Sequence, residues 1–290
     1  MITSVKPPWL VVKSASQNEL NSTRALLDYY KLKTVCQEAW CPNIYHCWKK
    51  GAVTLMILGD TCTRSCAFCA TSAGDPKGKI DNSEPDIIAE YIAAASLDYI
   101  VITSVTRDDL PDGGAGVFAS VIERVRAKMK QVRIEVLIPD FGGSLAALEQ
   151  VVMAQPDVIG HNIETVERLT PDVRDTRASY KTTLRILKAI KDMFPKVITK
   201  SGLMLGMGES EMDITGTLRD LRQCDVDILT IGQYLSPSPE HLPIVKYITP
   251  EDFMKYEALA YEIGFRSVVA GPLVRSSYES ARAMKKAINS

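Results

Sequence analysis

The sequence predicts an α/β fold, a partial (β/α)6 barrel in which parallel strands alternate with helices. Two observations predict it. From Val53 onward, short β-branched runs alternate with longer amphipathic stretches, and six such units follow one another. Repeated strand–helix units imply parallel strands with right-handed crossovers. An active site would then lie at the C-terminal ends of the strands. A doubly wound open sheet gives a similar pattern and remains the alternative.

Each expected element follows from its residue pattern. Short apolar runs rich in Val and Ile predict strands at Val53–Leu58, Asp98–Thr103, Val132–Ile138, Asp157–Gly160, Val197–Leu205 and Asp227–Gly232. Apolar residues at helical spacing predict helices, most clearly at Asp86–Ala95, Gly116–Lys130, Ser144–Ala154, Tyr180–Phe194 and Met212–Gln223.

Two flanks lie outside these units. Residues 1–50 contain a helical stretch, Ser16–Tyr30, and three cysteines. Residues 250–290 contain a helical pattern at Glu251–Ile263, a short strand pattern at Arg266–Ala270 and a terminal helical segment. We expect residues 51–249 to form the barrel and both flanks to pack on it as extensions.

The overall composition is that of an ordinary globular protein, with 46% hydrophobic and 24% charged residues. The formal charge of −1 gives no global field that would attract nucleic acid or a membrane. No apolar run approaches the roughly 18–20 residues that span a bilayer, and the N-terminus has no signal-peptide pattern. We therefore expect a cytoplasmic protein with no nucleic-acid or membrane partner.

The cysteines are concentrated in one part of the chain. Six of the seven lie between Cys36 and Cys69, and the seventh is Cys224. A disulfide framework is typical of small secreted domains, whereas clustered thiols in a cytoplasmic protein of this size more often bind metal or perform redox chemistry. Cys224 has no cysteine neighbour, and we expect it to be a small buried hydrophobic residue.

The first cysteine triad to consider is Cys62, Cys66 and Cys69, with three and then two intervening residues, directly after the first expected strand. Three thiolates in a short loop can hold three irons of a [4Fe–4S] cluster and leave the fourth iron open. Phe68 is placed to shield such a cluster or to meet an adenine ring. A structural zinc site would need four protein ligands, usually as paired knuckles, and no second knuckle has that spacing. This spacing on a β/α chain resembles the radical S-adenosylmethionine superfamily.

A second triad lies in the N-terminal flank, where Cys36, Cys41 and Cys47 have four and then five intervening residues. The alternative is a zinc site completed by His46, but adjacent His46 and Cys47 cannot easily both reach one tetrahedral ion. We therefore expect a second cluster, which would act as a sulfur source or an electron relay.

Motifs that are more specific than the superfamily pattern run along the chain. They are Cys36–Trp48 (CQEAWCPNIYHCW), Met56–Cys66 (MILGDTCTRSC), Thr103–Gly114 (TSVTRDDLPDGG), His161–Thr165 (HNIET), Gly202–Glu209 (GLMLGMGE) and Ala270–Tyr278 (AGPLVRSSY). By these motifs the chain resembles lipoyl synthases, and the resemblance extends from about Lys6 to Tyr278.

The resemblance implies two [4Fe–4S] clusters. Cys62, Cys66 and Cys69 would hold the cluster that binds and reductively cleaves S-adenosylmethionine. The N-terminal triad would hold an auxiliary cluster whose fourth iron is bound by a serine of the Arg-Ser-Ser-Tyr motif, Ser276. A serine oxygen is a harder ligand than a thiolate, which suits a cluster that must give up sulfide. On the residues alone, helix capping by Ser276 and Ser277 is the alternative.

Contacts to S-adenosylmethionine are expected at the strand ends. Asn162 and Glu164 would bind ribose hydroxyls, and Arg177 would pair with the methionyl carboxylate, a task suited to a planar guanidinium. Thr103 and Ser104 would meet the methionyl amine. Each of these five residues has an exposed polar loop position as its alternative.

The implied reaction is sulfur insertion at C6 and C8 of an octanoyl chain linked to a lysine of a carrier domain. The implied partners are octanoylated carriers, namely the E2 subunits of 2-oxoacid dehydrogenases and the H protein of glycine cleavage, and an electron donor such as ferredoxin or flavodoxin. Two alternatives remain open: a biotin-synthase-like enzyme and a non-catalytic protein with two zinc sites.

Overall fold

The computed structural model describes residues 6–12 and 21–290. The helical stretch expected at Ser16–Tyr30 lies partly outside the described residues, and its described part contains α1 (Asn21–Tyr29). The chain divides into two compact units. We call residues 12–64 and 70–157 the N-terminal unit, and residues 1–11, 65–69 and 158–290 the C-terminal unit. The boundaries expected near residues 50 and 249 stay predictions.

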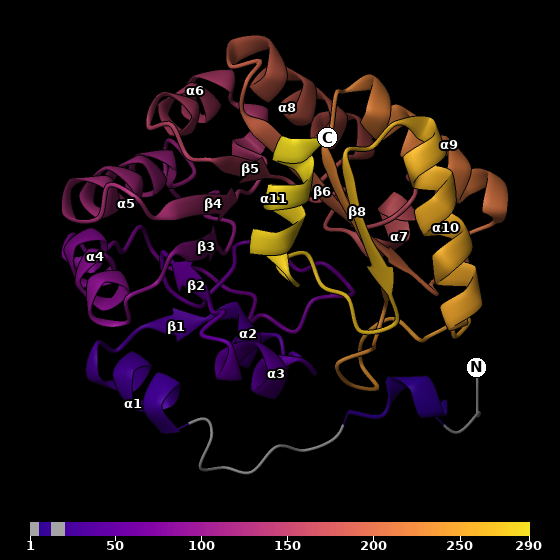
Figure 1. Cartoon of the computed structure of the whole chain (residues 1–290), viewed down its shortest axis with the longest axis horizontal. Helices are drawn as coiled ribbons and strands as arrows, with labels where there is room; N and C mark the ends of the chain where they lie inside the picture. Colours follow the sequence, from indigo (N-terminus) through magenta and orange to yellow (C-terminus); the bar gives the residue numbers. More distant parts are fainter. Residues whose placement is uncertain (1–5, 13–20) are drawn as a thin grey trace. The chain divides into compact units, whose positions relative to one another are not determined.

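The strands of the N-terminal unit follow one another in chain order. The short β1 runs antiparallel to β2, and β2, β3 and β4 are parallel. Helices α4, α5 and α6 pack one against the next on one side of these strands (Figure 1). The elements of this unit, besides α1, are β1 (Lys33–Thr34), α2 (Val35–Glu38), α3 (Ile44–Lys49), β2 (Thr54–Ile57), α4 (Glu84–Ala94), β3 (Tyr99–Ser104), α5 (Ala115–Lys128), β4 (Arg133–Leu137), η3 (Phe141–Gly143) and α6 (Leu145–Met153).

The C-terminal unit repeats this pattern with four parallel strands, again in chain order. Its last helix, α11, contacts β7 and β8 (Figure 1). The elements are η1 (Pro8–Leu10), β5 (Val158–Gly160), η4 (Glu167–Leu169), α7 (Thr170–Val173), α8 (Tyr180–Met193), β6 (Ile198–Leu205), α9 (Glu211–Gln223), β7 (Ile228–Gln233), α10 (Pro250–Ile263), β8 (Ser267–Gly271) and α11 (Ser280–Asn289).

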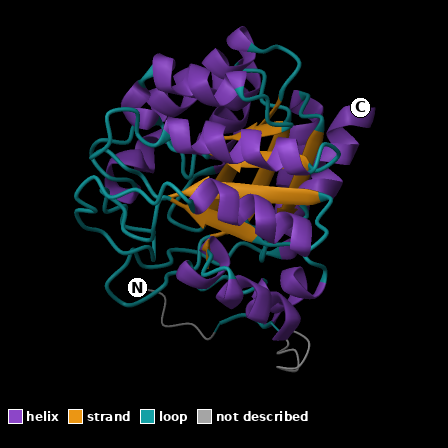
Figure 2. Cartoon of the chain, turned by 90° about the vertical axis from the view of Figure 1, so that its left-hand side faces the viewer, coloured by secondary structure: helices purple, strands orange, loops and turns teal. Residues whose placement is uncertain are grey.

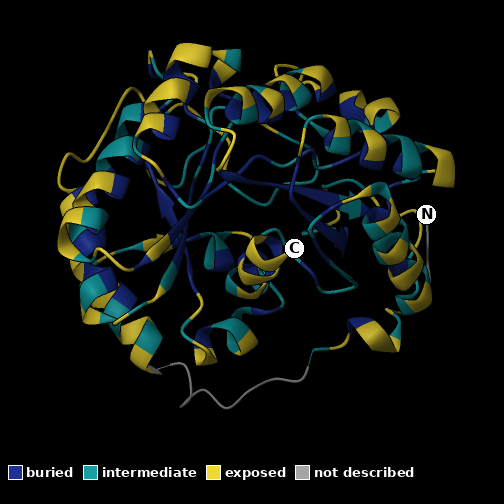
Figure 3. Ribbon diagram, turned by 45° about the horizontal axis from the view of Figure 1, so that its top comes forward, coloured by how far each residue is buried: buried dark blue, intermediate teal, exposed yellow. Residues whose placement is uncertain are grey.

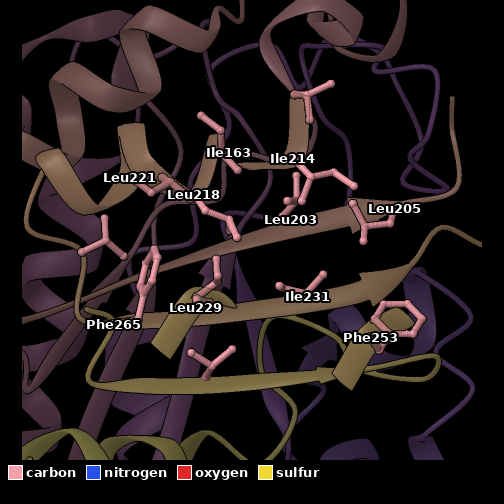
Figure 4. Packing of buried hydrophobic residues seen from close by; sticks show 14 of the residues in the cluster. Ile163, Leu203, Leu205, Ile214, Leu218, Leu221, Leu229, Ile231, Phe253 and Phe265 are labelled. Atoms are coloured by element: carbon pink, nitrogen blue, oxygen red, sulfur yellow. The ribbon is translucent and has the colours of Figure 1, made fainter. Parts of the chain in front are cut away.

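The strands are apolar because both of their faces are covered. Leu203 of β6 and Leu229 of β7 are at most 2% exposed, and they belong to a core cluster that also includes Leu218 and Leu221 of α9 (Figure 4). Strands covered on both faces have near-continuous apolar sequences, whereas helices keep one polar face. The same contrast is visible in the buried strands and mixed helix surfaces of Figure 3, and Figure 2 shows helices flanking the strands.

The alternation of strands and helices expected from the sequence is confirmed. Each of the six expected strands begins and ends within one residue of β2 to β7. A doubly wound sheet reverses its strand order at a switch point, and neither unit does so within itself. No helix in the described part of the chain is long and apolar enough to cross a membrane.

Candidate functional site

The loop after β2 carries Cys62 and is closed by its own backbone. The Cys62 amide donates to the carbonyl of Ser72, and the Gly74 amide donates to the carbonyl of Cys62, both at 2.8 Å. The Cys62 thiol accepts a backbone hydrogen bond from Arg64, with 3.4 Å between nitrogen and sulfur. Cys62 therefore lies just after the carboxyl end of β2, as expected, in a loop that these backbone hydrogen bonds close.

Residues 65–69 belong to the C-terminal unit, where two other segments hold them. Ala67 donates its amide to the Val173 carbonyl at 3.0 Å and accepts from the Leu242 amide at 3.1 Å. The His241 Nε2 lies 3.0 Å from the Cys69 carbonyl oxygen. The backbone around Cys66 and Cys69 is thus fixed by hydrogen bonds on both sides.

The Cys66 thiol lies beside a turn that begins at Asp175. The Asp175 amide donates to the Cys66 sulfur at 3.3 Å, and the Asp175 carboxylate accepts the Ser65 amide at 2.9 Å. Burial raises the pKa of the Cys66 thiol to about 11; the Asp175 amide and Arg174 oppose this shift, and the neighbouring Cys69 adds to it. Binding to a metal therefore requires this thiol to lose a proton that its burial favours keeping.

Arg177, expected to pair with a methionyl carboxylate, binds a carboxylate of the protein instead. Its Nε and Nη2 donate to the two oxygens of Asp175 at 2.9 and 3.0 Å. This fork is the largest influence that lowers the pKa of Asp175. The side chain of Arg177 is 50% exposed. The expected contact of Arg177 with S-adenosylmethionine stays a prediction. In the structure, Arg177 fixes the turn beside Cys66 by binding Asp175.

Asn162 and Glu164 lie where β5 ends, as expected. Glu164 continues the pairing with β6, because its amide donates to Gly202 and its carbonyl accepts from Met204. It does so with φ of 66°, a left-handed conformation that costs a non-glycine residue about 1–2 kcal/mol. Desolvation of its carboxyl raises the pKa, which Arg174 and the hydrogen bond from Asn162 oppose. A strained residue with a desolvated carboxyl is the kind found at ligand sites.

Two polar atoms near this carboxyl are buried without a hydrogen-bond partner among the described residues: Oδ1 of Asn162 and Nε of Arg174. The Asn162 amide nitrogen donates to Glu164 at 3.1 Å, and an Arg174 Nη1 donates to Thr183 at 2.9 Å, so both side chains are held in place. Buried polar groups are nearly always satisfied. The unsatisfied acceptor and donor therefore fit a polar ligand such as the ribose and methionyl groups of S-adenosylmethionine.

Arg174 is a residue that sequence reasoning missed. Its guanidinium acts electrostatically on both Glu164 and Cys66. The available signal in the sequence is the pair of arginines in Val173-Arg-Asp-Thr-Arg.

In the N-terminal unit, Thr103 and Ser104 end β3, as expected. The Thr103 hydroxyl donates to the Leu137 carbonyl at 2.9 Å, which leaves it able only to accept. The Ser104 hydroxyl oxygen is buried and finds no partner among the described residues. Both hydroxyl oxygens can therefore accept a hydrogen bond from a ligand, and that of Ser104 can also donate one.

The ring of Phe68 packs against an apolar group formed by Val173, Met207 and Tyr234. This contact anchors the cysteine loop within the C-terminal unit. The expected role of Phe68 beside a cluster or an adenine stays a prediction.

A buried ion-pair network in the N-terminal unit centres on Arg64, a second residue group that sequence reasoning missed. The guanidinium donates four hydrogen bonds of 2.7 to 2.9 Å, two to Asp108 and two to Asp140. The side chains of Arg64 and Asp140 are only 5% and 2% exposed. Although burial alone lowers the pKa of the guanidinium, these two carboxylates raise it above its ordinary value. An arginine between two cysteines and acidic residues after β3 and β4 were the available signals.

The second triad lies on two short helices and the turn between them. Cys36 is in α2 and is 7% exposed, Cys47 is in α3, and the Cys41 amide donates to the Cys36 carbonyl at 3.0 Å. Among the described residues, no three His, Cys, Asp or Glu side chains converge as ligands of one metal ion. In a [4Fe–4S] cluster each thiolate binds its own iron, so the ligands surround a larger volume. None of the seven cysteines forms a disulfide. Three thiols on two neighbouring short helices and the turn between them, none in a disulfide, are a donor set of the kind that holds a [4Fe–4S] cluster.

Ser276 lies in the turn before α11. The helix begins at Ser280, and its N-cap is Glu279, whose side chain makes no capping hydrogen bond. Neither Ser276 nor Ser277 is therefore the N-cap residue of this helix, as the alternative from the sequence would require. Ser276 forms no hydrogen bond with any described residue, so its hydroxyl is available to a ligand.

Comparisons with known proteins give the family. The model of the radical SAM superfamily matches residues 56–221. A lipoyl synthase of Thermus thermophilus is 52% identical over 97% of this chain and 87% of its own length. A lipoyl synthase of Pyrobaculum calidifontis is 51% identical over 96% and 95%.

A solved structure shares the fold at low sequence identity. The FeFe-hydrogenase maturase HydG from Carboxydothermus hydrogenoformans aligns over 93% of this chain and 78% of its own, with a TM-score of 0.56 and 12% identity. The expected α/β partial-barrel fold is thereby confirmed. With about half of its residues shared over nearly its whole length, the chain belongs to the lipoyl synthase family of radical SAM enzymes.

Proposed function

We propose that Cys62, Cys66 and Cys69 hold a [4Fe–4S] cluster that binds S-adenosylmethionine, and that the N-terminal triad with Ser276 holds a second one. The reaction itself follows from the family: a lipoyl synthase inserts two sulfur atoms, at C6 and C8 of a protein-bound octanoyl-lysine. The observation that carries the assignment is the coexistence of two cysteine triads with a serine hydroxyl that no described residue occupies. When bound, the first cluster and S-adenosylmethionine supply the radical that abstracts hydrogen, and the second cluster supplies the sulfur.

The residues of the chain would bind and orient, because aliphatic C–H bonds offer no proton that a general base could remove. Asp175 and its partner Arg177 would keep the Cys66 thiolate facing a fixed amide. Asn162 would accept a hydrogen bond from a ribose hydroxyl through its unsatisfied Oδ1, and Ser104 would accept from the methionyl amine. Glu164 would supply a carboxylate to the ribose hydroxyls; desolvation raises its pKa, and Arg174 and the hydrogen bond from Asn162 oppose that shift.

Family membership makes octanoylated carrier proteins the substrates. We further propose that these are the lipoyl-bearing E2 subunits and the H protein of glycine cleavage, and that ferredoxin or flavodoxin delivers the electrons. We propose a cytoplasmic location, where seven cysteines, none of them in a disulfide, would stay reduced.

The assignment is tested by anaerobic reconstitution followed by reaction with an octanoyl-lysine peptide, S-adenosylmethionine and dithionite, read by mass spectrometry. A dithiolated octanoyl product with about two 5′-deoxyadenosine molecules per product is expected. Cys66→Ala should abolish 5′-deoxyadenosine formation, whereas Cys36→Ala should retain it and lose sulfur insertion. Cys224→Ala is the matched control and should behave as wild type. Retained sulfur insertion in Cys36→Ala would contradict the assignment of the second cluster.

A further inference from the structure

The turn that carries Ser276 is anchored at both ends within the C-terminal unit. At its start, the Arg275 guanidinium donates through one nitrogen to the Gln233 carbonyl at 3.2 Å and to the Val274 carbonyl at 2.8 Å. Gln233 is the last residue of β7. The turn therefore begins against the carboxyl end of a core strand.

The backbone comes unusually close to β7 at the same place. A Cβ added to Gly232 would lie 2.1 Å from the Val274 carbonyl oxygen, so only glycine lets the turn approach this closely. Val274 in turn donates its amide to Gly271 at 3.1 Å. These contacts fix the entry of the turn without using a side chain of Ser276.

At the far end of the turn, Ser280 is held from inside the unit. Lys200 of β6 is 2% exposed, and its Nζ donates to the Ser280 hydroxyl at 2.6 Å. Ser280 is 4% exposed and is the first residue of α11. A buried hydrogen bond from a charged group is among the stronger ones in proteins.

This contact is not explained by the stability of α11. A cation near a helix N-terminus opposes the helix dipole, and burying an ammonium group is itself unfavourable. Helix α11 has other anchors, since Ala283, Met284 and Ala287 are buried and Lys286 contacts Tyr261. A role in placing the turn accounts for the contact better.

Ser276 lies between these two anchors and forms no hydrogen bond with either of them. Tyr278 donates its amide to the Arg275 carbonyl at 2.9 Å, which closes the turn, and Glu279 adopts φ of 50° before the helix begins. Ser277 has interactions of its own, whereas Ser276 makes no hydrogen bond with a described residue. We infer that Lys200 is a positioning residue, which through Ser280 holds the Arg275–Ser280 turn in one conformation so that Ser276 is presented before any cluster binds. This inference rests on the proposed ligand role of Ser276.

The first test uses the cluster-free protein and hydrogen exchange read by mass spectrometry. Lys200→Met and Ser280→Ala should each raise exchange in residues 274–281 about tenfold or more, the factor expected for losing a hydrogen bond to a charged group. Lys188→Met, which changes an exposed lysine of α8 in the same unit, is the control and should leave this segment unchanged. Unchanged exchange in both Lys200→Met and Ser280→Ala would overturn the inference.

The second test asks whether positioning matters to the ligand. In a Cys62→Ala, Cys66→Ala, Cys69→Ala background, the reduced second cluster is compared by electron paramagnetic resonance in four variants. Ser276→Ala and Lys200→Met should change the spectrum in the same direction, Ser280→Ala should do so partly, and Ser277→Ala should not. A wild-type spectrum for Lys200→Met beside a changed one for Ser276→Ala would overturn the positioning role alone. An unchanged Ser276→Ala spectrum would overturn the serine ligand and this inference with it. Sulfur insertion in the otherwise unaltered enzyme reports the reaction separately.

Discussion

Replacing Arg64 with methionine should destabilise the protein strongly even before any cluster is bound. The guanidinium makes four hydrogen bonds to two carboxylates, and the Asp140 side chain is only 2% exposed. Removing the cation leaves a buried carboxylate without its partner, a change that typically costs about 3–5 kcal/mol. Arg64→Lys keeps the charge but cannot bind both carboxylates with paired bonds, so it should lose roughly half of that amount.

The assay is denaturant unfolding of the cluster-free protein, with stability taken from the midpoint at unchanged slope. Arg124→Met is the matched control in the same unit, because its pair with Asp86 is 3.4 Å long and exposed; it should change stability by less than about 1 kcal/mol. Adding Asp140→Asn to Arg64→Met should recover part of the loss, since the stranded charge is removed. Arg64→Met unfolding at the same denaturant concentration as Arg124→Met would refute the reasoning.

Three further predictions concern other contacts. Gly232→Ala should displace the turn at Val274, whose carbonyl oxygen would lie 2.1 Å from the added carbon, and should lower the amount of iron bound by the N-terminal triad. Gly216→Ala is the control: this residue of α9 has open space around it, and the change should stabilise the fold by about 0.5–1 kcal/mol. Asn162→Ala and Arg174→Met should each weaken S-adenosylmethionine binding about tenfold or more, measured by equilibrium dialysis, with little change in melting temperature. The reason is that each wild-type side chain has a buried polar atom that only a ligand would satisfy. Unaltered affinity would show that these residues do not belong to the binding site. Asp157 is desolvated, but hydrogen bonds from Ile134, Arg133 and Arg126 lower its pKa below the ordinary 3.8. Its carboxylate therefore stabilises the fold above that pH, and this stabilisation is lost as the pH falls below it. Asp157→Asn should flatten the acid side of a plot of stability against pH, and an unchanged acid side would contradict this.

The strands and the long helices could be predicted from the sequence because burial on both faces and helical amphipathicity leave local patterns. The run Val197–Leu205 matches β6 within one residue, and Tyr180–Phe194 matches α8 equally well. The short elements α2, α3 and α7 were missed. Each has at most six residues, too few for a helical period to show.

The cysteines and the strand-end polar residues could be named because their spacing is local. The partners that fix them could not, since Arg64 meets Asp140 across 76 positions and His241 meets Cys69 across 172. Such contacts depend on how the strands assemble, which no local pattern encodes. Arg174 could not be named for the same reason: the two arginines, three residues apart, look alike in the sequence, and only the structure shows that Arg177 binds Asp175.

The bonds that hold residues 65–69 also set an order of events in the making of the enzyme. Ala67 is held by Val173 and Leu242, so its surroundings are incomplete until a segment more than 170 residues further along has been synthesised. Chains emerge from the ribosome in sequence order. Cys66 and Cys69 would leave the exit tunnel long before the backbone that fixes them exists. Iron delivered to the nascent chain would meet a loop that no later segment yet holds. Cluster insertion is therefore expected to be efficient only after the last strands have folded.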